Sequence, residues 1–244
     1  EQGALPMSVD DAVTMMKPNY DNYCFSENKL ADCMFNSDMV LYCMKSLILH
    51  GVKPKEIVDP NIRTDFNKLA YLVRLDHGLG ENFSVIKEIA EQGEIVTEIV
   101  THFSALEMTD VGNFKSLLFY FGLLSIKGVD MMGRPILHIP NLVVREQLFN
   151  FLIQGYARHD IFKLDVNRLR TLFENMSFKG DWKPMFEFLA EAIREQSRIR
   201  EYIEGEAHIK GFLLAYLSMF RYYQLYPEYE MNKGFADFFF KPSP

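Results

Sequence analysis

The sequence of 244 residues lacks the signatures of several common functional classes. Its three cysteines, Cys24, Cys33 and Cys43, match no zinc-site spacing, so we expect reduced thiols. No apolar run approaches the roughly 20 residues of a membrane helix, so we expect no membrane contact and a cytoplasmic protein. No glycine-rich phosphate loop and no Gly-Lys-Ser or Gly-Lys-Thr occurs, so nucleotide hydrolysis is not encoded in these residues.

Positive charge and catalytic signatures are also scarce. The net charge of -7 argues against a protein that coats nucleic acid. The six histidines include no pair at ligand spacing on one helix face, and no serine or cysteine lies in a nucleophile signature. What the chain does have is 48% hydrophobic and 14% aromatic residues, which is typical of a globular protein with a sizeable core.

Residues 113–156 predict a helix, a β-hairpin and a second helix. Gly122 is expected to end the first helix, and the segments 123–128 and 134–140 predict antiparallel strands joined by a turn. This order is a winged-helix-like pattern. The apolar residues that mark the two helices recur at three- and four-residue steps: Phe114, Leu117, Leu118 and Phe121, then Val144, Leu148, Leu152 and Tyr156.

Helices dominate the rest of the chain, and the only other early strand is expected over 95–101 because it is β-branched. The fold class we predict is mainly α with small β elements (α+β). Further helices are expected over residues 8–16, 36–50, 66–75, 82–92, 166–174 and 181–200.

The last forty residues predict a change in character. An amphipathic helix is expected over 206–224, followed by short strands over 229–231 and 235–240. Glu206 falls on the apolar side of that helix, and Asp237 is the one acid on a strand that is apolar on both faces. We therefore expect Asp237 to be buried, where a carboxylate needs a metal, a cation or a backbone donor as partner.

Glu206 and Asp237 are the candidate metal ligands. A helix carboxylate and a strand carboxylate that converge at a sheet end suit Mg²⁺ or Mn²⁺, which prefer oxygen ligands. The alternative is that Asp237 pairs with a lysine or arginine in the core and that Glu206 reaches water.

Three basic residues are weak candidates for nucleic-acid contact. Lys127 and Arg134 are the only cations of the predicted hairpin, and Arg145 follows on the next helix. A winged helix that reads DNA usually carries a denser basic cluster on its recognition helix and wing.

Four stretches together resemble a known family, that of bacterial proteins joining an AAA-ATPase-like domain to a C-terminal PD-(D/E)XK nuclease-like domain. The family has Tyr-Asn/Asp-Gly-Tyr-x-Phe, Ser-Leu-Leu-Tyr-x-x-Gly-x-Leu-Thr-Ile, Ile-Pro-Asn-x-Glu/Val-Val-Arg and Gly-Arg-Ala-Asp segments in this order. The similar stretches here are Tyr20-Asp-Asn-Tyr-Cys-Phe-Ser-Glu27, Leu117-Leu-Phe-Tyr-Phe-Gly-Leu-Leu-Ser-Ile126, Ile139-Pro-Asn-Leu-Val-Val-Arg-Glu146 and Gly234-Phe-Ala-Asp237.

The resemblance implies that this chain is a fragment. An ATP-binding core with Walker motifs would precede it, and the Glu-x-Lys strand of the nuclease would follow it. Asp237 matches the family's metal-binding Asp residue by residue, whereas Glu206 is a looser match to a helical Glu. The implied regions are a helical part of the ATPase-like region (1–105), a winged-helix-like module (106–160), a helical spacer (161–200) and an incomplete nuclease-like start (201–244).

The function implied is a regulatory and linking portion of an ATP-dependent, nucleic-acid-processing protein, with DNA or RNA as partner. Mg²⁺ or Mn²⁺ would serve the complete nuclease-like domain, and ATP the upstream domain. The chain alone is expected to be inactive as a nuclease. The alternatives are a non-catalytic protein-interaction scaffold and a winged-helix DNA-binding module.

Overall fold

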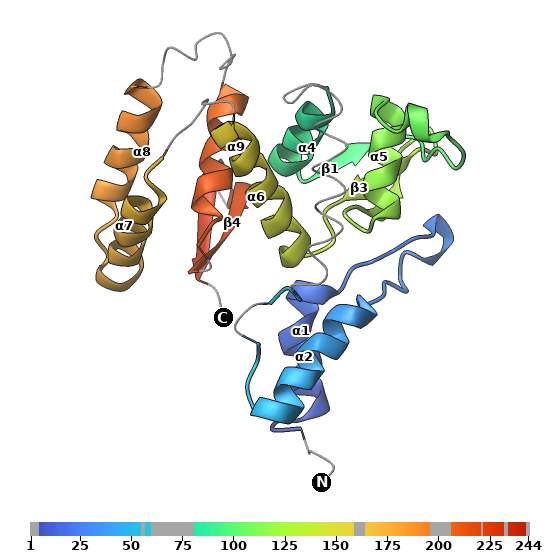
Figure 1. Ribbon diagram of the computed structural model, residues 1–244, viewed down its shortest axis with the longest axis horizontal. Coiled ribbons are helices and arrows are strands. Elements are labelled where there is room, and N and C mark those ends of the chain that lie inside the picture. Colours follow the sequence, from blue (N-terminus) through green and yellow to red (C-terminus); the bar gives the residue numbers. More distant parts are fainter. Residues whose placement is uncertain are drawn as a thin grey trace. The chain divides into compact units, whose positions relative to one another are not determined.

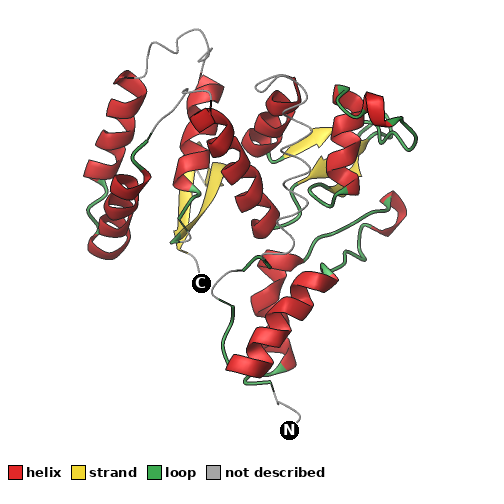
Figure 2. Cartoon of the chain, in the orientation of Figure 1, coloured by secondary structure: helices red, strands yellow, loops and turns green. Residues whose placement is uncertain are grey.

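The computed structural model describes residues 5–54, 57–59, 81–158, 164–195, 206–220, 222–231 and 234–242. Helices predominate and strands are few, which confirms the predicted class of mainly α with small β elements (Figure 1 and Figure 2). The helix predicted over 66–75 lies outside the described residues. No helix within the described part of the chain is long and apolar enough to cross a membrane. The chain divides into two compact units, residues 1–148 and 149–244.

Side-chain caps define the ends of several helices. Helix α1 (Val9–Tyr20) begins after Ser8, whose hydroxyl accepts a hydrogen bond from the Asp11 amide at 3.1 Å. Helix α2 (Ser37–His50) is capped in the same way by Asn36, and it ends at Gly51, which has φ 70°. Such N-caps each contribute about 1 kcal/mol to helix stability. The prediction for α2 is confirmed, whereas α1 extends four residues beyond the predicted end.

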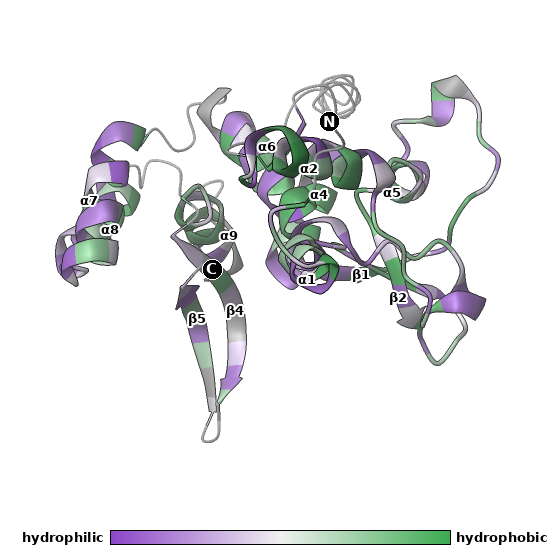
Figure 3. Ribbon diagram, turned by 90° about the horizontal axis from the view of Figure 1, so that it is seen from below, coloured by the Kyte–Doolittle hydropathy of each residue, from purple (hydrophilic) through white to green (hydrophobic). Residues whose placement is uncertain are grey.

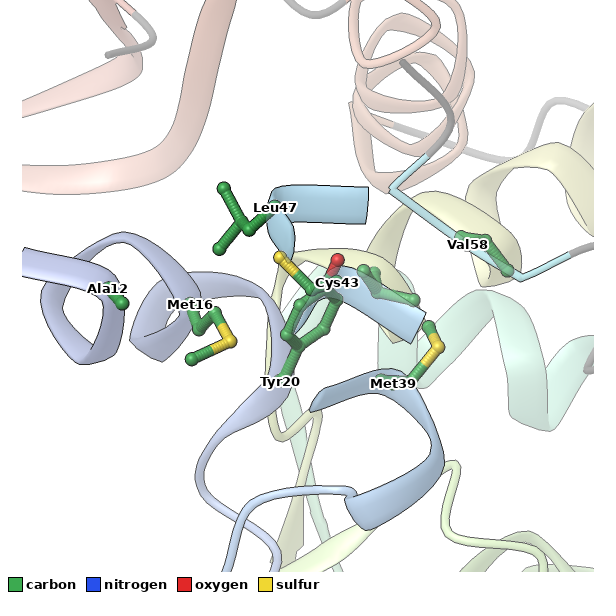
Figure 4. Packing of buried hydrophobic residues seen from close by; sticks show 8 residues of the cluster. Ala12, Met16, Tyr20, Met39, Cys43, Leu47 and Val58 are labelled. Carbon is green, nitrogen blue, oxygen red and sulfur yellow. The ribbon is translucent and has the colours of Figure 1, made fainter. Parts of the chain in front are cut away.

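Helices α1 and α2 pack through residues spaced four apart. Each helix therefore presents one apolar stripe, and the two stripes meet in a core (Figure 4). The Tyr20 hydroxyl at the end of α1 also donates to the Ile57 carbonyl oxygen at 2.9 Å. The buried members of this core are Ala12, Met16, Tyr20, Met39, Cys43, Leu47, Val58 and Val143.

A three-stranded antiparallel sheet forms the second part of the first unit. Its order is β1 (Glu94–Val96), β3 (Pro135–His138) and β2 (Ser125–Val129), so β3 lies at the centre. The hairpin of β2 and β3 was predicted and is confirmed, with an irregularity between Ile126 and Gly128. The strand predicted over 95–101 ends at Val96, and residues 97–104 have no regular structure.

Three helices flank these strands in sequence. Helix α4 (Glu81–Gln92) ends before Gly93, as predicted, and α5 (Val111–Tyr120) precedes β2. Helix α6 (Leu142–Arg158) follows β3. The predicted apolar stripes are largely confirmed, although Phe121, predicted as part of the first stripe, follows the end of α5 and is only half-buried. The stripe residues that are buried are Phe114, Leu117 and Leu118 on α5, and Val144, Leu148, Leu152 and Tyr156 on α6.

The second unit contains the helical pair α7 (Val166–Lys179) and α8 (Lys183–Glu195), the helix α9 (Glu206–Leu217) and a hairpin of β4 (Tyr223–Met231) and β5 (Gly234–Pro242). The helix predicted over 206–224 is wrong in its second half, because α9 ends at Leu217 and β4 begins at Tyr223. The tyrosine-rich segment instead pairs with the phenylalanine-rich β5, which favours strand structure.

Helix α9 is also less amphipathic than predicted. Its residues are hydrophobic on nearly every side, as the colouring of Figure 3 shows. A helix of this kind is stable when it is buried rather than lying at a surface. The buried side chains of α9 are Phe212, Leu214, Ala215, Tyr216 and Leu217.

Candidate functional site

Asp237 lies on β5 and is exposed, so the expectation that it is buried is wrong. Asp237 lies within the antiparallel ladder of β4 and β5, in which Ala236 is paired with Tyr229 and Phe238 with Pro227. A hairpin with only two strands leaves much of its surface open, so the aromatic residues on β5 do not enclose the carboxylate. The Asp237 carboxylate therefore stays in contact with water and is not destabilised by desolvation.

The alternative was an ion pair between Asp237 and a lysine or arginine in the core. Asp237 is exposed, and among the described residues no lysine or arginine forms a salt bridge with it. An exposed carboxylate without such a cation presents two oxygen atoms to a ligand from solution. Asp237 is thus accessible to a metal ion because it is exposed. The sequence had instead suggested a buried carboxylate that needs a metal as its partner.

The second candidate ligand, Glu206, is the first residue of α9. Its position at the helix start agrees with the prediction, and its side chain lies outside the described residues. Within the described part of the chain, no group of three or more His, Cys, Asp or Glu side chains forms a metal site. Asp237 therefore suits Mg²⁺ or Mn²⁺ in ligand type, and a bound ion would need further oxygen ligands.

Aromatic side chains hold the hairpin that carries Asp237. Tyr229 and Phe239 stack across the two strands with ring centroids 4.5 Å apart. At the other end of the hairpin, Phe240 contacts Phe186 of α8 edge-on at 6.2 Å and Tyr223 at 5.8 Å. Such pairs each contribute about 0.5–1.5 kcal/mol beyond the buried area, so β5 is a fixed platform for Asp237.

The candidate nucleic-acid contacts do not form an unpaired basic patch. Lys127 pairs with Glu94 of the neighbouring segment, and the Arg134 guanidinium binds the Asp130 carboxylate at 2.7 Å. Arg145 lies half-buried on α6. Both cations of the hairpin are therefore offset by a carboxylate, and the assignment of these three residues to nucleic acid stays a prediction.

Helix α5 is the element that would read DNA in a winged-helix module. Most of its side chains are buried, and Lys115 is its only basic residue. A recognition helix needs an exposed polar face that can enter the major groove. The burial of α5 therefore argues against DNA reading by this module.

The segments around residues 20–27, 117–126 and 139–146 meet at one buried polar junction, which the sequence did not predict. The Ser125 hydroxyl donates to the Asn22 carbonyl oxygen at 2.7 Å and accepts from the Cys24 amide at 2.7 Å. The Ile126 amide donates to the Cys24 carbonyl oxygen at 3.0 Å. The segment after α1 is thus bonded directly to the start of β2.

Asn141 extends the same polar junction to α6. Its side-chain amide donates to the Asp21 carbonyl oxygen at 3.0 Å, and its side-chain oxygen accepts from the Val144 amide at 3.2 Å. Burial raises the pKa of Tyr23, while hydrogen bonds from Asn141 and Asn36 act in the opposite direction. Fully satisfied buried groups of this kind define a unique packing, so we assign the junction a structural role.

Left-handed backbone at two positions completes the junction. Asn22 has φ 72° and is the only non-glycine residue with positive φ in the described part of the chain. Gly122 has φ 70°, and an added Cβ there would lie 3.5 Å from the Tyr23 ring. Asparagine tolerates this left-handed conformation better than most residues, which suits it to position 22. The available sequence signal was a polar residue inside each apolar stretch, namely Ser125 and Asn141.

Comparison with known proteins bears on the second unit. A family model described as the PD-(D/E)XK nuclease superfamily matches residues 204–244. This C-terminal segment is similar to those nucleases. The matched residues contain α9, β4 and β5 together with both candidate metal ligands. No curated protein and no solved structure matches the chain.

The segment that is similar to PD-(D/E)XK nucleases has a simple order of elements. The helix precedes an antiparallel hairpin, and Asp237 lies on the second strand. These nucleases typically use Mg²⁺ or Mn²⁺, which agrees with the oxygen ligand that Asp237 offers. The similarity of residues 204–244 suggests a nuclease-related domain, with nucleic acid as its class of partner.

Proposed function

We propose that α9, β4 and β5 form the first part of a metal-dependent nuclease-like domain, in which Asp237 is a metal ligand. The observation that carries this proposal is the exposure of Asp237 on a strand within the segment that resembles the nuclease superfamily. Glu206, at the start of the adjoining helix, is the second ligand we propose. A bound Mg²⁺ or Mn²⁺ would polarise the phosphate and lower the pKa of a bound water.

The protein's own residues have a positioning role in this proposal. The stacked Tyr229–Phe239 pair and the Phe186–Phe240 contact fix β5, so Asp237 is held at a constant place for a ligand. Pre-organisation of this kind lowers the entropy lost when an ion is bound. Cleavage of DNA or RNA would further require ligands beyond those that the structure describes.

We propose that the preceding part links this domain to an ATP-binding region, in a regulatory role within an ATP-dependent nucleic-acid-processing protein. The support is the resemblance of the segments at residues 20–27, 117–126 and 139–146 to proteins with an AAA-ATPase-like domain. In this proposal residues 1–105 belong to the ATPase-like region, 106–160 form the winged-helix-like module and 161–200 the spacer. The pairing of β1 with β3 suggests that the module's sheet begins earlier, near residue 94.

The metal assignment is tested by titrating the 244-residue chain with Mn²⁺ and following its backbone amide NMR signals. Paramagnetic broadening is expected first around Asp237, and it should be lost in Asp237→Asn, which keeps the size of the side chain but removes its charge. Glu230→Gln is the matched control, because Glu230 is also exposed on the same hairpin. Equal broadening in Asp237→Asn and in the unchanged protein would contradict the assignment.

A protein-interaction scaffold is the second candidate function. Met131 and Met132 are almost fully exposed in the turn between β2 and β3. The turn that presents them is held by the Asp130 carboxylate, which accepts from the Met132 and Arg134 amides at 2.9 and 2.8 Å. Exposed methionines suit apolar protein surfaces, whereas the paired charges beside them do not favour a phosphate backbone. Retention of the cellular role in Asp237→Asn and its loss in Met131→Gln/Met132→Gln would favour this candidate.

A further inference from the structure

Two cysteines lie opposite each other where the chain leaves α1. Tyr23 and Met34 form an antiparallel bridge in which each amide donates to the other residue's carbonyl oxygen, at 3.0 and 2.9 Å. The next residues, Cys24 and Cys33, therefore occupy the adjoining pair position, where the backbones of the two opposed residues are not hydrogen-bonded to each other. Directly opposed residues at such positions have Cα atoms about 4.5 Å apart. That separation is within the range of about 4.4–6.8 Å that a disulfide requires.

The two thiols also converge on the same short segment. Cys24 Sγ donates to the carbonyl oxygens of Ser26 and Lys29 at 3.3 and 3.5 Å, and Cys33 Sγ donates to that of Leu30 at 3.5 Å. The presence of Cys24 also raises the pKa of the Cys33 thiol, which agrees with two neighbouring side chains. Both sulfur atoms thus lie at the same short turn.

The surroundings give the two cysteines different roles. Cys24 is buried, and its backbone is fixed to Ser125 and Ile126 on β2. Cys33 is exposed, so a reagent in solution reaches its sulfur first. We propose that Cys24 and Cys33 are a thiol modification site that closes into an intramolecular disulfide, with a peroxide as the oxidant.

The chemistry needs no further reactant. The Cys33 thiolate attacks one peroxide oxygen, so that an S–O bond forms, the O–O bond breaks and hydroxide leaves to become water. The Cys24 thiolate then attacks the Cys33 sulfur, an S–S bond forms and the S–O bond breaks, and the departing hydroxide becomes a second water. Two thiols are oxidised and one peroxide is reduced to two waters.

The rate of this oxidation increases with pH. Desolvation first, and then the charge and hydrogen bond of Cys24, raise the pKa of Cys33, and the carboxylates of Asp21 and Asp32 act in the same direction. Because the thiolate is the nucleophile, little of it is present at neutral pH. The site therefore responds to sustained oxidation, and alkaline conditions accelerate it.

Closure of the disulfide fastens a surface segment to the sheet. The cross-link spans residues 24–33, which include the short 3₁₀ turn Glu27–Lys29. Phe25 in this segment contacts Phe119 of α5 at 5.6 Å and Tyr23 at 6.3 Å. An oxidised chain would thus hold this segment against α5 and β2 permanently.

The test is peptide mapping of the native 244-residue chain after treatment with hydrogen peroxide. The expected result is a peptide pair linked through Cys24 and Cys33, with Cys43 recovered as a free thiol after unfolding and alkylation. Thermal unfolding should also shift upward by roughly 5 °C on oxidation, because the cross-link restricts the unfolded chain. The shift should disappear on reduction with dithiothreitol.

Cys33→Ser is the decisive variant, since its side chain is exposed and the fold should tolerate the change. It should form no linked peptide and show no shift, while Cys43→Ala should retain both. Recovery of Cys24 as a free thiol in the oxidised protein, with Cys33 present only as sulfinic acid or in covalent dimers, would overturn the proposal.

Discussion

The polar junction at Asn22, Ser125 and Asn141 and the strand that carries Asp237 contrast sharply. At the junction, the buried side chains of Ser125 and Asn141 are hydrogen-bonded to the backbone of distant segments, and Asn22 contributes its backbone carbonyl oxygen. On β5, the Asp237 carboxylate faces solvent. Residues of the first kind are needed for folding, whereas a residue of the second kind is available for a ligand. Similarity of sequence alone does not distinguish these two reasons for a motif.

The largest effect in this comparison is expected for Ser125→Ala. The change leaves the buried Cys24 amide and Asn22 carbonyl oxygen without their partner, which should lower the free energy of unfolding by about 2 kcal/mol. Urea denaturation monitored by circular dichroism measures this loss. Ser46→Ala removes an exposed hydroxyl bond and serves as the control, with an expected change within about 0.5 kcal/mol. Equal losses of unfolding free energy in the two variants would mean that the Ser125 hydrogen bonds contribute no more to stability than an exposed one.

A smaller effect is expected at Asn22, whose backbone is left-handed. Asn22→Ala should lower the free energy of unfolding by about 1 kcal/mol, because alanine tolerates the left-handed backbone conformation less well than asparagine does. Asn22→Gly should be close to neutral, because glycine adopts this conformation without steric cost. The same denaturation experiment separates the two variants, and a neutral Asn22→Ala would show that the junction adjusts its backbone.

The smallest effect is expected for Asp237→Asn. Because the carboxylate is exposed and forms no salt bridge with a described residue, the free energy of unfolding should change by no more than about 0.5 kcal/mol. Loss of Mn²⁺ binding in a variant of unchanged stability would sharpen the contrast with Ser125. A large destabilisation would instead indicate that Asp237 is needed for folding, as Ser125 is.

Local sequence patterns predicted the helices and caps of the first unit well. Ser8, Gly51 and Gly93 each lie at the helix boundary that their chemistry favours. These signals succeed because a cap acts within three or four residues of its own position.

The failures occurred where distant segments decide the structure. The apolar run after Leu217 has helical spacing, yet its later part pairs with β5, and that pairing determines its conformation. The strand after Val96 stops because β3 begins only at Pro135, opposite Thr97. Exposure of Asp237 likewise depends on how few strands surround it, which its own alternation pattern does not reveal. Ser125 was missed as a junction residue because its partners lie about a hundred positions earlier.

That separation in sequence has a consequence for the order in which the molecule folds. The Ser125 hydroxyl and the Asn22 carbonyl oxygen are 103 residues apart in the sequence. Forming their hydrogen bond therefore closes a long loop, which costs conformational entropy of the chain. The α1–α2 pair, by contrast, is assembled from neighbours in the chain and needs only a short closure. The polar junction therefore forms late, and it locks together helices and strands that have already acquired their shape.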